Sequence, residues 1–252
     1  MNYYNETIFS MAEPDLYGAI FDDKIDIVRK KFEKNDEYDM IQRNYNILKL
    51  AFNRSSYEII NFLITKMDSF YNDSISRDIV FARLCQGCFH DYKKLYFILQ
   101  HIKNINIQDK QFDDNTILYR AMVALRASAE KYTNGYIDVI KLLVESGADP
   151  YIENKYGDST IDLIVNTCKQ KIELFEILLN NMTKKYIKVE TLNQIIFSNC
   201  INKYDLIEML LPYVIDINAP LQYTNITILK NIKISNPEET DIIELLEANG
   251  AL

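Results

Sequence analysis

The residues best suited to chemistry are two cysteines and a histidine close together in the sequence. Cys85 and Cys88 are three positions apart, and His90 follows them. A structural zinc site needs four ligands, which usually come as two such pairs. The chain has no second Cys-x-x-Cys and no His-x-x-x-His, so we expect inert helix cysteines and no metal.

Other catalytic chemistry also lacks the groups it needs. A cysteine nucleophile requires an activating histidine, and the two histidines, His90 and His101, lie in the same segment. The sequence contains no Gly-rich phosphate loop, no Gly-x-Ser-x-Gly elbow and no His-Glu-x-x-His. The acidic pairs at 22–23 and 113–114 lack the spacing of a calcium loop and fall where turns are expected. We therefore predict a protein that is not an enzyme and has no cofactor.

Composition and charge limit the class of protein and its partners. With 252 residues, 48% of them hydrophobic, the chain can bury a substantial core. Its low content of glycine (six residues) and proline (five residues) favours helical structure. A net charge of −8 disfavours nucleic acid and favours a protein partner with a basic surface. The sequence shows no signal peptide, no membrane-spanning stretch and no disulfide framework, which predicts a cytoplasmic protein, monomeric outside its complex.

One pattern recurs seven times along the chain. It is a polar anchor followed by two apolar residues, a spacer and two further, mostly apolar residues, which predicts a helix with one broad apolar face. An acidic anchor in the first turn would be stabilised by the helix dipole, so we interpret these carboxylates as helix-starting residues. The anchors are Asp26, Glu58, Lys94, Asp138, Glu173, Asp205 and Asp241, spaced by 32, 36, 44, 35, 32 and 36 residues.

A shorter helical segment precedes each anchor, which makes helix, turn, helix and loop the repeating unit. These segments cover residues 16–19, 48–51, 80–82, 116–121, 159–164, 191–195 and 227–232.

The best-formed units resemble ankyrin repeats. The resemblance is carried by residues 114–121, 136–149, 154–163 and 241–252, and a glycine (Gly147, Gly250) stands nine residues after two of the anchors. We expect these glycines, and Asn35 at the same offset, to end helices in the left-handed conformation. The resemblance implies an all-α ankyrin-repeat solenoid of helix-turn-helix units with short inter-repeat loops. It would form a single domain over 1–252, with units at about 13–36, 44–68, 76–109, 113–154, 156–183, 189–218 and 223–252.

The 44-residue spacing predicts a lengthened first helix in one unit. Residues 124–131 are rich in strong helix formers and should extend this helix by about two turns, until Thr133 to Gly135 stop it.

The resemblance also implies where a partner would bind. In ankyrin arrays the inter-repeat loops form fingers and the first helices form a palm, which places the fingers near 104–114, 149–158 and 216–224. Among the aromatic residues we expect Tyr17, Tyr119, Tyr151, Tyr156 and Tyr223 to be exposed. The predicted partner-binding residues are Tyr17, Lys49, Asp109, Asp113, Asp114, Tyr119, Arg120, Arg126, Tyr151, Tyr156, Asp158, Asp162, Asn193, Gln194 and Tyr223.

The functional hypothesis that follows by analogy is a non-catalytic protein–protein interaction module. The favoured version is a stand-alone cytosolic inhibitor or immunity protein that neutralises a toxin or effector by binding it. The alternative is a viral or parasite ankyrin factor that captures a host protein, in which case the cytoplasm would be that of the host cell.

Overall fold

The described part of the chain is helical. The computed structural model describes residues 15–33, 40–68, 74–89, 91–129, 132–165, 171–181, 186–199 and 202–252. Within these ranges the chain forms helices, turns and isolated β-bridges but no β-strand, so the predicted all-α class is confirmed. The chain divides into two compact units, Met1–Lys103 (unit 1) and Asn104–Leu252 (unit 2), and each is described by itself.

The described residues of unit 1 form three pairs of helices. They are α1 (Leu16–Phe21), α2 (Ile25–Glu33), α3 (Met40–Arg54), α4 (Tyr57–Asp68), α5 (Ser74–Gly87) and α6 (Tyr92–Leu99). Each first helix packs on the second helix of its own pair. The first helices also contact each other, α1 with α3 and α3 with α5. Fully buried Leu48, Ile59, Phe81 and Leu95 fill the space between them.

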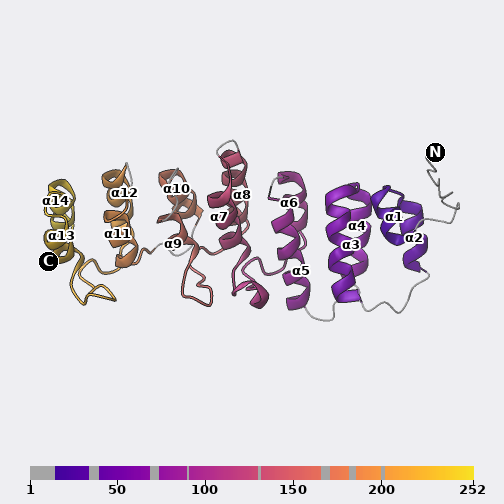
Figure 1. The fold of residues 1–252 in the computed structure, drawn as a ribbon, viewed down its shortest axis with the longest axis horizontal. Coiled ribbons are helices and arrows are strands. Elements are labelled where there is room, and N and C mark those ends of the chain that lie inside the picture. The colour runs from indigo at the N-terminus through magenta and orange to yellow at the C-terminus, as the bar shows by residue number, and fades with distance from the viewer. Residues whose placement is uncertain are drawn as a thin grey trace, which may run out of the picture. The chain divides into compact units, whose positions relative to one another are not determined.

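Unit 2 repeats this plan with four pairs. They are α7 (Ile117–Ala127), α8 (Thr133–Glu145), α9 (Thr160–Val165), α10 (Lys171–Asn181), α11 (Val189–Ile196), α12 (Lys203–Leu210), α13 (Ile228–Ser235) and α14 (Thr240–Ala248), with 3-10 turns η1 (Lys110–Phe112) and η3 (Leu211–Tyr213). The first helices α7, α9, α11 and α13 contact one another in that order. Loops connecting successive pairs of unit 2 project below the helices in Figure 1.

The acidic anchors begin second helices in five of six cases. Asp26, Glu58, Glu173, Asp205 and Asp241 all lie in a first turn, as predicted. The prediction is wrong for Asp138, because α8 begins at Thr133 and Asp138 falls in its second turn. The non-acidic anchor, Lys94, has its backbone amide bound at 3.1 Å by the side chain of Asp91, which caps α6. An acidic residue therefore sits at the start of that helix as well, three positions earlier.

The predicted extension of the first helix through residues 124–131 is wrong, because α7 ends at Ala127. With 11 residues, α7 is longer than α11 and α13, which have eight each, but shorter than α3 and α5, which have 15 and 14. It ends at Ala127 because Ser128 is extended, and both its amide and its hydroxyl donate to the Leu125 carbonyl, at 3.0 and 2.8 Å. Residues 133–135 form the first turn of α8 rather than a stop. Residues 130–131 lie outside the described ranges.

Two glycines end helices as predicted. Gly147 and Gly250 have φ of 93° and 85°, in the left-handed region. The amide of the next residue, Ala148 or Ala251, donates to a carbonyl five positions back at 3.0 Å, which satisfies one of the last carbonyls of the helix. Asn35, expected to do the same, lies outside the described residues.

Candidate functional site

The candidate site is a set of three loops in unit 2. We call residues 104–116 loop A, 149–159 loop B and 216–227 loop C; they end at α7, α9 and α13. All three predicted finger segments are loops. They have the same kind of turn at their first residue and the same kind of backbone conformation before the helix that follows.

Each loop opens with the same side-chain turn. A carboxylate or amide oxygen accepts a hydrogen bond from the backbone amide two residues later, which bends the chain away from the preceding helix. The pairs are Asn104 with Asn106 at 3.0 Å, Asp149 with Tyr151 at 2.9 Å, and Asp216 with Asn218 at 2.9 Å.

Each loop also closes in the same way. A left-handed residue stands two positions before the helix cap: Asp114 with φ of 59°, Gly157 with 82° and Asn225 with 54°. Thr116 and Thr227 then cap α7 and α13 by accepting the amides of the residues three positions later. The loops therefore reach the first helices with a fixed backbone path.

The residue that completes each opening turn also ties its loop to the next repeat. The Asn106 side chain donates to the Gly147 carbonyl at 3.1 Å and accepts the Asp149 amide at 2.7 Å. Asn218 makes the same pair of bonds to Gly250 and Leu252, at 2.9 and 2.7 Å. In loop B the equivalent residue is Tyr151.

Tyr151 fulfils this role with a ring instead of an amide. Its hydroxyl accepts the Tyr186 amide at 2.8 Å and donates to the Tyr186 carbonyl, and the two rings stack with centroids 3.9 Å apart. Burial raises the Tyr151 pKa to about 12, although the hydrogen bond with the Tyr186 backbone acts in the opposite direction.

Loops A and B are also bonded directly to each other. The Gln108 side-chain Nε2 donates to the Glu153 carbonyl at 2.8 Å, and the Lys155 backbone amide donates to the Asp113 carbonyl at 3.0 Å. The Asn154 side chain donates to the Asn115 side-chain oxygen at 3.0 Å. Lys155 also forms an ion pair with Asp113. The two loops thus form one hydrogen-bonded surface.

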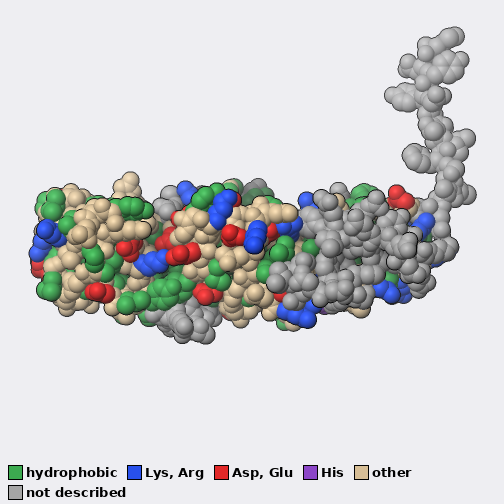
Figure 2. All heavy atoms as spheres, turned by 90° about the horizontal axis from the view of Figure 1, so that it is seen from below, with side chains coloured by type: hydrophobic (Ala, Val, Ile, Leu, Met, Phe, Trp, Pro, Cys, Tyr) green, Lys and Arg blue, Asp and Glu red, His purple; other side chains and the backbone are tan. Residues whose placement is uncertain are grey.

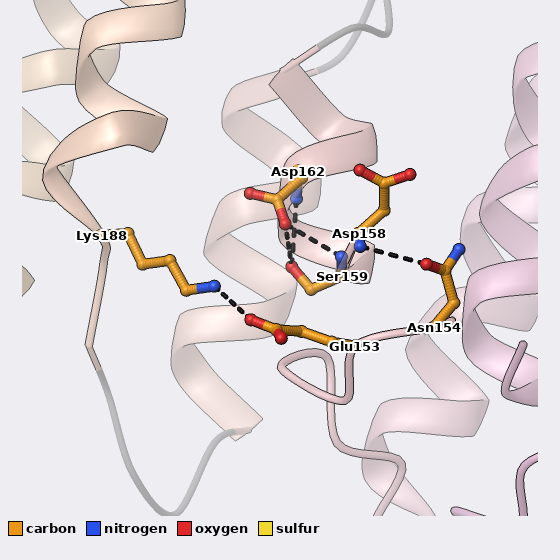
Figure 3. A network of polar contacts seen from close by, with 6 residues as sticks. All are labelled: Glu153, Asn154, Asp158, Ser159, Asp162 and Lys188. Carbon is orange, nitrogen blue, oxygen red and sulfur yellow. Dashed lines mark hydrogen bonds and ion pairs between the residues drawn. The ribbon is translucent and has the colours of Figure 1, made fainter. Parts of the chain in front are cut away.

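Side chains of loop B and of the helices beside it hold the loop in place by hydrogen bonds and an ion pair (Figure 3). The Asn154 carboxamide oxygen accepts the Tyr156 amide at 2.9 Å and the Asp158 amide at 3.1 Å. Asp162, in the first turn of α9, accepts both the amide and the hydroxyl of Ser159, at 2.9 and 2.6 Å, and its own amide donates to the Ser159 hydroxyl at 3.4 Å, which is the reciprocal arrangement of a capping box. Glu153 forms an ion pair with Lys188, which precedes α11.

Three predicted partner-binding residues are buried, which corrects the prediction for them. Asp109, Tyr119 and Arg120 have 2%, 8% and 6% of their surface exposed. Arg120 Nη1 lies 3.9 Å from Asp109 Oδ2, and its guanidinium covers the Phe112 ring at 4.3 Å, so this pair supports loop A from beneath. Tyr119 packs under loop B, where burial, and secondarily the Asp158 charge, raises its pKa.

The other predicted residues of unit 2 differ in exposure. Tyr156 and Tyr223 are 66% and 93% exposed, and Arg126, Asp158 and Gln194 are exposed as well. The partly buried ones are Asp113, Asp114, Tyr151, Asp162 and Asn193. Asn193 also accepts a hydrogen bond from Asn231 of α13 at 2.8 Å, which links two first helices.

Sequence reasoning missed one exposed aromatic residue of the loops. Phe112 is 43% exposed and stands four residues before its helix cap, the position that Tyr223 holds in loop C. That shared offset from Thr116 and Thr227 is the signal that could have found it. Over unit 2, Figure 2 shows hydrophobic side chains interspersed with carboxylates and cations on the face seen from below.

Tyr17 and Lys49 belong to unit 1. Both are exposed and each stands one position after a leucine of a first helix, α1 or α3. They are therefore not part of the loop surface of unit 2.

The two cysteines considered for metal or nucleophilic chemistry lie in the core of unit 1. Cys85 and Cys88 are buried, and burial raises the Cys88 pKa to about 11, which keeps its thiol protonated near neutral pH. His101 packs against the rings of Phe81 and Phe97, while His90 lies outside the described residues. In the described ranges, no three His, Cys, Asp or Glu side chains are grouped so that they could hold a metal ion. Among the described helices, none combines the length and apolar character that a bilayer-spanning segment requires.

Comparison with known families supports the repeat assignment. The model of the ankyrin repeat matches residues 113–155, from the tip of loop A through α7 and α8 into loop B. With helix pairs repeating in both units, the chain is consistent with an ankyrin-repeat solenoid, a fold that suggests a protein–protein interaction module. A comparison with curated proteins gave no match.

Proposed function

We propose that this chain binds another protein through loops A, B and C and the exposed residues of the first helices of unit 2. The observation that carries the proposal is the exposure of Tyr156 and Tyr223 on loops whose backbones are already fixed by hydrogen bonds. A preorganised loop loses little entropy on binding, and a tyrosine brings a large, rigid contact surface.

Charge favours a partner with a basic surface. Unit 2 contains 14 Lys and Arg against 21 Asp and Glu, a net −7, whereas unit 1 contains 14 against 15, a net −1. Asp158 is exposed on loop B and Asp114 partly so on loop A, and neither forms an ion pair with another described residue. Complementary charge would speed encounter and orient the partner.

The finer proposal is that binding inhibits the partner, as an immunity protein inhibits a toxin or effector. Its support is the same surface: a rigid group of aromatic and acidic loops is suited to covering a functional cleft on a basic protein. An inhibitor needs no catalytic group of its own.

The test begins with capture of the partner from the native host and co-expression of the neighbouring open reading frame. If that neighbour is toxic alone and harmless beside this chain, the inhibitor proposal is supported. A neighbour that is not toxic alone, or that stays toxic beside this protein, contradicts it.

Point variants then test the surface itself. Asp158→Lys and Tyr223→Ala should each weaken partner binding about tenfold or more without lowering the melting temperature. Glu244→Lys is the matched control, because Glu244 is an exposed carboxylate of α14 that does not belong to the three loops. Equal affinity of all three variants would remove the loops from the binding site.

A further inference from the structure

An open groove of unit 2 lies between two second helices, α12 and α14. Its volume is about 470 Å³. The residues that line it are Tyr204 of α12 and Asp241, Glu244, Leu245 and Ala248 of α14. None of these residues belongs to loops A, B or C, so the groove is a surface separate from the loops.

Two residues at repeated positions explain the groove. The position directly before the anchor holds Ile137 in α8 and Ile172 in α10, but Tyr204 in α12. Ile137 is buried, whereas Tyr204 is 41% exposed and forms one wall. Seven positions after the anchor, α14 has Ala248 where α10 has Asn180. The short alanine side chain leaves space along α14.

The two carboxylates of the groove, Asp241 and Glu244, are exposed and form no ion pair with any described residue. Asp241 accepts a hydrogen bond from the Thr240 hydroxyl at 3.5 Å. By contrast, the neighbouring carboxylates, Glu239 and Glu247, are each paired with a lysine, at 2.6 and 2.5 Å. The groove therefore offers negative charge to a ligand, in a unit whose net charge is −7.

This lining matches the chemistry of an arginine side chain. A guanidinium group is planar, stacks on the face of an aromatic ring and donates hydrogen bonds to carboxylates, while its methylene stem packs on apolar surface. Tyr204 supplies the ring, and Asp241 and Glu244 supply the acceptors. The apolar surface comes from Leu245 and Ala248.

We propose that this α12–α14 groove binds an arginine side chain of another protein. Complementary charge selects the occupant, because two exposed carboxylates that no described residue neutralises attract a cation. The inference goes beyond the proposed function, since it concerns second helices and not the loops. Glu244→Lys should abolish binding in the groove and leave binding at the loops unchanged, so either proposal can fail while the other holds.

The direct test is NMR titration of the full chain, at low ionic strength, with three blocked peptides. One contains a single arginine, the second has lysine in its place, and the third has citrulline, which keeps the shape of arginine without its charge. The Leu245 and Ala248 signals should shift saturably with the arginine peptide, less with lysine and not with citrulline. An equal response to citrulline would overturn the proposal, and an equal response to lysine would overturn the assignment to arginine.

Charge variants give the second test. Asp241→Asn and Glu244→Gln should each weaken binding of the arginine peptide about threefold, as loss of an exposed ion pair implies. Glu176→Gln is the matched control, because Glu176 is exposed and stands three residues after its anchor on α10, as Glu244 does on α14, but does not line the groove. An equal loss in the control would overturn the proposal.

Variants of Tyr204 and Ala248 separate recognition from folding. Tyr204→Phe keeps the ring and should keep the preference for arginine over lysine, whereas Tyr204→Leu should lose it. Ala248→Leu fills the groove from an exposed position of α14, and leucine is a good helix former, so the melting temperature should not fall while peptide binding is lost. Peptide binding that survives in Ala248→Leu would place the arginine elsewhere and overturn the proposal.

Discussion

Loops A and C open and close in the same way around two very different buried residues. Five positions after the first residue of the opening turn, loop A buries the carboxylate of Asp109 beside Arg120, whereas loop C buries the aliphatic side chain of Leu221. Asp109 is 2% exposed and Leu221 5%. The fold therefore requires a buried side chain at this position but does not fix its polarity.

The backbone explains this tolerance. In loop A the Asp109 carbonyl accepts the amides of Phe112 and Asp114, at 2.8 and 3.1 Å. In loop C the Leu221 carbonyl accepts the amides of Thr224 and Asn225, at 3.3 and 2.9 Å. Since main-chain atoms make these bonds, the side chain has only to fill the space beneath the loop and satisfy its own polar atoms.

The largest expected effect comes from breaking the ion pair of loop A. Arg120→Ala should lower the free energy of unfolding by about 3 to 5 kcal/mol, because it leaves the Asp109 carboxylate buried without its countercharge. Urea unfolding at neutral pH measures the loss. A loss below about 1 kcal/mol would show that the pair is not structurally important.

Replacing both partners sharpens the comparison. The double variant Asp109→Leu with Arg120→Met gives loop A the leucine of loop C and removes the countercharge as well, and it should be far more stable than Arg120→Ala, near the wild type or above it. A double variant as unstable as the single one would mean that loop A, unlike loop C, specifically needs the charged pair.

Loop C should respond to lost volume instead of lost charge. Leu221→Ala should cost about 2 kcal/mol or more, because it removes buried methyl groups and leaves a cavity. Ile215→Ala is the control: Ile215 is 79% exposed, so its truncation should change stability by less than about 0.5 kcal/mol. Equal effects in urea unfolding would contradict the role of Leu221 as the core of this loop.

This comparison also shows what the sequence could predict. Helix pairs follow from apolar periodicity, and five acidic anchors begin helices because the dipole acts wherever a helix starts. Burial of Asp109 and Arg120 was not predictable in the same way, because charged residues are normally exposed and only the fold brings this pair together. The early end of α7 depends on one hydrogen-bonding residue, Ser128, which composition does not reveal.

In loop B we expect a loss of stability of intermediate size that depends on pH. Tyr151→Phe should lose roughly 1 to 2 kcal/mol, because the hydroxyl makes two hydrogen bonds with the Tyr186 backbone. Burial raises the Tyr151 pKa in the folded protein from 10.0 to about 12, so its ionisation favours the unfolded state. This contribution to stability is present below pH 10 and is lost as the pH rises through about 12.

The measurement is urea unfolding of wild type and Tyr151→Phe from pH 8 to 12. The wild type should lose more stability over this range than the variant. Tyr223→Phe is the matched control, since Tyr223 is 93% exposed and should leave the pH profile unchanged. Parallel profiles for wild type and Tyr151→Phe would contradict the assignment.

The smallest effects concern the left-handed residue that closes each loop. Gly157→Ala in loop B should cost about 1 kcal/mol, because a Cβ is strained at φ of 82° and a stiffer unfolded chain recovers only part of the loss. Asp114→Gly is the reverse change at the equivalent position of loop A. Relief of strain there is offset by the greater freedom of glycine in the unfolded chain, so we expect a change within about 0.5 kcal/mol. A clear destabilisation by Asp114→Gly would show that the Asp114 side chain, and not only its backbone angle, holds loop A in place.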